Sequence, residues 1–134
     1  MKLFIISSIS VFLSIMIIDG AWLTLTVSRF YRPHLGHLWV ESISYLPAIA
    51  LYLIYAVAVS LLLILPGMQL QYSLLKVFAL GFCFGLAAYG CYDITNHATL
   101  KDWPWIVTIV DMLWGAILTG MASCIAFKVV GYFN

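Results

Sequence analysis

Residues 92–104, with the sequence YDITNHATLKDWP, separate two long apolar runs and decide where one predicted helix ends and the next begins. Residues 74–95 form the run before the break, and Lys76 and Asp93 are its only charged residues. Pro104 is well placed to start the next helix, over residues 104–129, because its missing N–H would have no intrahelical partner there. Two earlier apolar runs, at about 3–27 and 43–65, complete a set of four predicted helices.

Composition places these helices in a membrane. The chain has 134 residues, of which 65% are hydrophobic and 8% are charged, whereas a soluble domain carries about 25% charged residues. Each apolar run exceeds the roughly 20 residues that cross a bilayer as a helix. We therefore predict an all-α, integral membrane four-helix up-down bundle with four transmembrane helices, forming a single domain over residues 1–134 with the lipid bilayer as its partner.

Charge excludes one class of partner and leaves the orientation open. The net charge of +1 provides no basic surface for nucleic acid. In the predicted topology three basic residues lie on each side of the membrane, so the positive-inside rule selects neither orientation. The basic residues are Arg29, Arg32 and Lys101 on the loop side, and Lys2, Lys76 and Lys128 on the side of the termini.

The acidic residues all fall toward the loop side of the predicted bundle. They are Asp19, Glu41, Asp93, Asp102 and Asp111. At 1.5 Å per residue, Asp19 and Asp111 lie about 10–12 Å below the same surface. A carboxylate at bilayer depth costs ~2.5–3.5 kcal/mol on insertion scales, so we expect both to face the bundle interior.

Aromatic and polar residues recur at helical spacing around these carboxylates. Trp22 follows Asp19 by three residues, Trp114 follows Asp111 by three, and Tyr89, Asp93 and His97 are four residues apart. The predicted pocket in one leaflet comprises Asp19, Trp22, Tyr89, Asp93, Asn96, His97, Asp111 and Trp114. In the alternative interpretation the aspartates only hold the helices in register, and Asn96 only caps a helix.

Several stretches together resemble the DUF2177 family of small bacterial membrane proteins. They are Tyr92-Asp93-Ile94-Thr95-Asn96, Ala98-Thr99-Leu100, Trp103-Pro104, Asp111-Met112 with Trp114-Gly115, and Asp19 with Trp22-Leu23. The resemblance covers nearly the whole chain and implies a four-helix protein of the bacterial inner membrane. The family is one of unknown function, so the resemblance assigns no catalytic residue and no cofactor.

Three functions remain open. The first is binding or transport of a proton, a cation or a small organic cation, with a possible homodimer through Gly81 and Gly85; packing within the chain is the other use of this GxxxG motif. The second is a small accessory subunit. The third is a membrane enzyme acting on a lipid or another apolar substrate by carboxylate acid–base chemistry, or through a metal held by Asp93, His97 and Asp111.

No catalytic motif favours the enzyme. The sequence has no HExxH, nucleophile elbow or phosphate-binding loop. Cys83, Cys91 and Cys124 fall in apolar runs without ligand spacing and are predicted to be unpaired thiols.

Overall fold

The computed structural model describes residues 1–39, 42 and 44–134 of the chain. Of these residues, 89% are helical and none forms a strand. Four helical segments are long and apolar enough to cross a membrane: Lys2–Leu38, Tyr45–Gln69, Leu74–Thr99 and Trp105–Phe133. The predicted all-α fold with four membrane-spanning helices is confirmed. Glu41, which the sequence analysis placed among the acidic residues of the loop side, lies outside the described residues.

Two of the four segments are built from several helical pieces. The first consists of α1 (Lys2–Thr26), the π-helical turn η1 (Val27–Tyr31), α2 (Arg32–Leu35) and the 3₁₀ turn η2 (Gly36–Leu38). The second consists of α3 (Tyr45–Val59), the π-helical turn η3 (Ser60–Ile64) and α4 (Leu65–Gln69). The last two segments are the uninterrupted helices α5 (Leu74–Thr99) and α6 (Trp105–Phe133).

The first two helical segments extend beyond residues 27 and 65, where the sequence predicted their ends, and pass through Pro33 and Pro66. Each proline follows a π-helical turn and occupies the first or second position of the short α-helix after it. Within a continuous helix a proline removes one hydrogen bond and its ring crowds the carbonyl four residues earlier. Here the turn before each proline has π-helical hydrogen bonds instead, from Arg32 N–H to the Val27 oxygen and from Leu65 N–H to the Ser60 oxygen. The first segment therefore continues past residue 27 to Leu38, and the second passes residue 65 and ends at Gln69.

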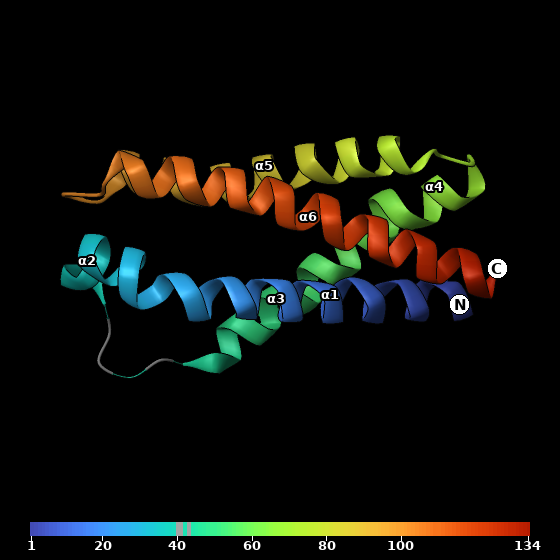
Figure 1. Cartoon of the computed structure of the whole chain (residues 1–134), viewed down its shortest axis with the longest axis horizontal. Helices are drawn as coiled ribbons and strands as arrows, with labels where there is room; N and C mark the ends of the chain where they lie inside the picture. The colour runs from blue at the N-terminus through green and yellow to red at the C-terminus, as the bar shows by residue number, and fades with distance from the viewer. Residues whose placement is uncertain (40–41, 43) are drawn as a thin grey trace.

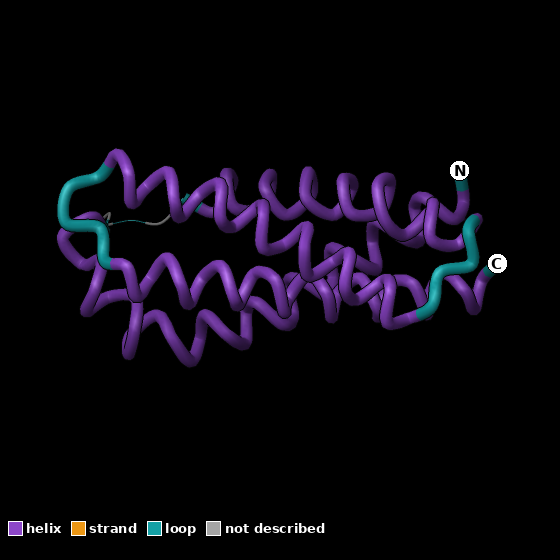
Figure 2. The backbone as a smooth tube through the Cα atoms, turned by 90° about the horizontal axis from the view of Figure 1, so that it is seen from above, coloured by secondary structure: helices purple, strands orange, loops and turns teal. Residues whose placement is uncertain are grey.

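The helices run along one long axis with both termini at the same end (Figures 1 and 2). α6 packs against α5 most extensively and then against α1, while α3 packs against α1. Figure 1 shows α3 crossing the other helices obliquely. This arrangement makes α6 the central helix of the bundle.

Glycines allow α5 and α6 to approach closely. A Cβ added at Gly81 would meet Ser123 Oγ at 2.8 Å, and one at Gly85 would collide with the main-chain oxygen of Gly115. These two glycines are thus buried against α6 of the same chain, and the surface expected for a homodimer through Gly81 and Gly85 is occupied within the chain. The oligomeric state itself stays a prediction.

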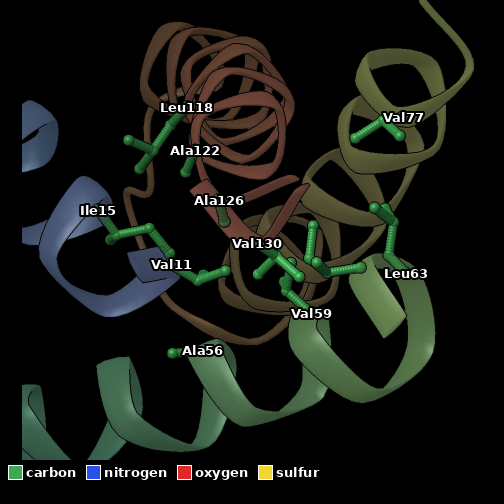
Figure 3. Packing of buried hydrophobic residues seen from close by; sticks show 11 residues of the cluster. Val11, Ile15, Ala56, Val59, Leu63, Val77, Leu118, Ala122, Ala126 and Val130 are labelled. Atoms are coloured by element: carbon green, nitrogen blue, oxygen red, sulfur yellow. The ribbon is translucent and has the colours of Figure 1, made fainter. Parts of the chain in front are cut away.

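The apolar core fills the half of the bundle nearer the termini. Side chains from α1, α3, η3, α5 and α6 point toward one another there (Figure 3): Val11, Ile15, Ala56, Val59, Leu63, Val77, Leu118, Ala122, Ala126 and Val130. The opposite half holds the buried aspartates, so the polar groups are segregated toward the loop end.

Candidate functional site

Each oxygen of the Asp19 carboxylate on α1 accepts one hydrogen bond. Asp19 is 6% exposed. Trp114 Nε1 on α6 donates to its Oδ1 at 2.8 Å, and the Tyr52 hydroxyl on α3 donates to its Oδ2 at 2.5 Å. Charge-assisted hydrogen bonds are about twice as strong as neutral ones. Asp19 therefore ties three helices together and has both oxygens occupied.

The carboxylate of Asp111 on α6 is only half occupied. The Tyr31 hydroxyl donates to its Oδ1, and Trp22 Nε1 in turn donates to the Tyr31 oxygen at 3.1 Å. Within the described residues, Oδ2 of Asp111 accepts no hydrogen bond. Tyr31 is the last residue of η1, so the π-helical turn sets the position of the hydroxyl that holds Asp111.

Trp22 and Trp114 join these two hydrogen-bond networks. Their rings are stacked, with centroids 4.2 Å apart and planes at 11°. Trp22 on α1 donates to Tyr31, which in turn donates to Asp111 on α6. Trp114 on α6 donates to Asp19 on α1. Each tryptophan therefore serves the aspartate of the other predicted pair: Trp114 bonds to Asp19, and Trp22 reaches Asp111 through Tyr31.

A cavity of about 300 Å³ lies beside Asp111. Its polar wall consists of Asp111 and four tyrosines, namely Tyr52, Tyr55, Tyr89 and Tyr92. Its apolar wall consists of Ile15, Leu51, Ala88 and Leu118. α1, α3, α5 and α6 all contribute to the lining, so the cavity depends on the assembled bundle.

Hydrogen bonds and a glycine fix the tyrosines of the wall. Thr119 Oγ1 donates to the Gly115 main-chain oxygen, which leaves Tyr55 to donate its hydroxyl to Thr119 at 2.7 Å. A Cβ at Gly115 would collide with the ring of Tyr89. Tyr52 is held by Asp19. Three of the four rings thus have a defined neighbour on another helix.

Asp93 and His97 lie apart from the cavity. Asp93 is fully buried, and neither of its carboxylate oxygens has a hydrogen-bond partner among the described residues. The His97 ring packs on Trp105, with centroids 3.6 Å apart. Neither residue lines the cavity.

Asn96 and two of the three residues predicted to hold a metal, Asp93 and His97, lie near the C-terminal end of α5. The main-chain oxygen of Asn96 accepts the N–H of Leu100 at 2.8 Å, which places Asn96 in the last turn of α5. In the part of the chain that the structure describes, no group of three or more His, Cys, Asp or Glu side chains is placed to hold a metal ion. The structure does not assemble Asp93, His97 and Asp111 into a metal site.

Sequence reasoning missed Tyr31 and gave Tyr52, Tyr55 and Tyr92 no place in the pocket. Tyr31 lies between the predicted helices 3–27 and 43–65, and Pro33 and Gly36 after it normally break a helix. Tyr52 and Tyr55 share a helix face at the depth of the aspartates, and that spacing was the available signal. Tyr92 begins the polar stretch 92–104 but was not among the residues of the predicted pocket.

Four long apolar helices around a core and a buried polar network define a multi-pass membrane protein. Residues 4–128 match the DUF2177 family, described as a predicted membrane protein, and the chain belongs to this family. No curated protein and no solved structure matches the chain.

Proposed function

We propose that this protein binds a small organic cation, an amine or a quaternary ammonium, in the tyrosine-lined cavity, with Asp111 as its counter-ion. The observation that carries the proposal is the pairing of four tyrosine rings with a carboxylate that has one unoccupied oxygen at the same cavity. Binding would give the free oxygen of Asp111 the partner that a carboxylate at membrane depth requires.

The chemistry of the lining favours an organic cation. The face of an aromatic ring attracts a cation, by about 0.5–1 kcal/mol at exposed sites and ~2 kcal/mol when both are desolvated. Metal ions instead need several oxygen or nitrogen ligands. The cavity volume, about 300 Å³, also falls at the lower end of the range of small-molecule sites, roughly 300–1,000 Å³.

The remaining members of the networks act as positioning residues in this proposal. Asp19 holds Tyr52 at the cavity wall, and Tyr31 holds Asp111. Val11, Ile15 and Leu118 are 0–2% exposed and fill the bundle between the cavity and the end that carries the termini. This conformation therefore favours binding from one leaflet over passage across the membrane.

Binding to the purified protein in lipid nanodiscs tests the proposal. Choline should change the fluorescence of Trp22 and Trp114, whereas its uncharged isostere 3,3-dimethylbutan-1-ol should bind far more weakly. Asp111→Asn keeps an acceptor for Tyr31 but removes the charge, and should weaken choline binding at least about tenfold, the loss of one charge-assisted contact.

Asp102→Asn is the matched control, because Asp102 is exposed in the turn after α5 and does not line the cavity. Tyr89→Leu provides a second variant that removes a ring and leaves every carboxylate in place. Equal binding of choline and its isostere, or unchanged binding by Asp111→Asn, would refute the proposed function and favour the accessory subunit.

A further inference from the structure

The geometry points to a more specific ligand: we infer that the cavity opens sideways into the bilayer between α3 and α5, and that it takes a cationic amphiphile. This ligand class has an ammonium headgroup and at least one hydrocarbon chain. The inference rests on the proposed function and specifies the substrate class of the same cavity.

The rim of the cavity lies at hydrocarbon depth. Leu51 on α3 is 60% exposed and Tyr92 on α5 is 61% exposed, and both line the cavity. Leu51 lies six residues after Tyr45, and Tyr92 lies seven before Thr99. At 1.5 Å per residue each is about 10 Å from the end of its span. Exposed groups at that depth meet acyl chains, because the hydrocarbon core is about 30 Å thick.

The helix arrangement explains why this side is open. α3 packs against α1 and α5 packs against α6, so α3 and α5 belong to different helix pairs. They meet deeper in the bundle, where the Tyr55 ring packs edge-on against Phe84 with centroids 5.4 Å apart. The oblique course of α3 in Figure 1 carries it away from this contact toward the loop end.

Among the residues that line the cavity, only Leu51 and Tyr92 are exposed, and the other seven are buried or half-buried. Toward the termini, Ile15 and Leu118 are buried in the core (Figure 3). Toward the loops, Tyr31, Trp103 and Val107 form a second buried cluster between the first segment and α6. The gap between α3 and α5 is therefore the side from which a ligand enters.

The chemistry of this path matches an amphiphile. A headgroup moving inward meets Tyr92 and Tyr52 first and then the free oxygen of Asp111, while an attached chain stays against Leu51 and the surrounding lipid. A closed cavity of about 300 Å³ would have no room for a long chain in addition to the headgroup. Tolerance of a long chain thus separates a lateral opening from a closed chamber.

The test compares tetramethylammonium with dodecyltrimethylammonium, with dodecanol as the uncharged control, on the protein in nanodiscs and with empty nanodiscs subtracted. Dodecyltrimethylammonium should bind and should displace tetramethylammonium, and dodecanol should do neither. Leu51→Trp places a large ring at the rim, in the space that the attached chain needs, and should weaken binding of the long-chain cation by about tenfold or more. The same variant should change tetramethylammonium binding by less than about twofold.

Leu53→Trp is the matched control, because Leu53 is 50% exposed on the same helix and does not line the cavity. It should leave both ligands unaffected. Binding of tetramethylammonium without displacement by the long-chain cation would overturn this inference alone, as would equal effects of Leu51→Trp and Leu53→Trp. If neither cation binds, the proposed function fails together with the inference.

Discussion

Replacing Asp19 and Asp93 separately by asparagine should change the free energy of unfolding in opposite directions. The substitution is the same, both side chains are buried, and both belong to membrane-spanning helices. They differ in their hydrogen bonds: Asp19 accepts from Trp114 and Tyr52, whereas neither oxygen of Asp93 has a partner among the described residues.

The loss expected at Asp19 follows from the donors around it. An indole nitrogen can only donate, so an asparagine at position 19 must turn its oxygen toward Trp114. Its amide group then faces the Tyr52 hydroxyl, which must turn to accept and leaves its own proton without an acceptor. Both hydrogen bonds lose their charged acceptor, and the Tyr52 proton loses its acceptor altogether, so Asp19→Asn should destabilise the protein by at least about 1.5–3 kcal/mol.

The gain expected at Asp93 follows from the absence of donors. A buried polar group without a partner costs about 1–3 kcal/mol, and more when it is charged. Asparagine has nearly the same volume as aspartate and cannot carry the charge, so Asp93→Asn should stabilise the protein by at least about 1 kcal/mol.

Reversible unfolding in mixed micelles, with sodium dodecyl sulfate as the denaturant and tryptophan fluorescence as the signal, measures both differences. Asp102→Asn in the exposed turn serves as the control and should stay within about 0.5 kcal/mol of the parent. Two destabilised variants of similar magnitude would show that Asp93 has partners in the folded protein, and the reasoning would be wrong.

Two other substitutions test the packing that shapes the cavity. Gly115→Ala should destabilise by about 1–3 kcal/mol because its methyl group collides with Tyr89, and Gly20→Ala, with nothing within 4 Å, should be neutral or stabilising in the same unfolding assay. Tyr31→Phe removes the donor to Asp111 Oδ1 and should cost about 1.5–3 kcal/mol. A double-mutant cycle with Asp111→Ala, which removes the acceptor, should return a coupling energy, and additivity of the two changes would contradict the contact.

Much of the architecture follows from simple features of the sequence. The apolar runs and the breaks between them predict four helices, because a bilayer requires about 20 apolar residues for each span. The helix ends were less predictable. Proline normally marks a boundary, yet Pro33 and Pro66 continue their segments after π-helical turns, and no hydropathy pattern reports such a turn.

The sequence predicted the membrane depth of the aspartates and the helix faces that they share with the tryptophans. It did not predict which side chain donates a hydrogen bond to which carboxylate. Spacing placed Asp19, Trp22, Asp111 and Trp114 on two facing stripes, and the structure brings these four residues together. Which atom reaches which carboxylate depends on how α1 and α6 are rotated against each other. Likewise, the close contact of α5 with α6 at Gly85 sets the rotation that leaves Asp93 outside the cavity. The binding role of the site stays a proposal.

The saturated carboxylate of Asp19 has a consequence for the order of synthesis. Its span emerges from the ribosome before the spans of its partners, because Tyr52 follows 33 residues later and Trp114 follows 95 residues later. Until the last span arrives, the nascent chain carries an aspartate that lacks its indole partner, at a cost of ~2.5–3.5 kcal/mol near the bilayer centre. An 18-residue stretch of this span has a mean hydropathy of 2.2, which offsets this cost during insertion. A ribosome stalled before residue 114 should therefore leave α1 inserted but incompletely packed. Asp19 would then lack its indole partner and be accessible to a membrane chaperone that recognises unpaired polar groups.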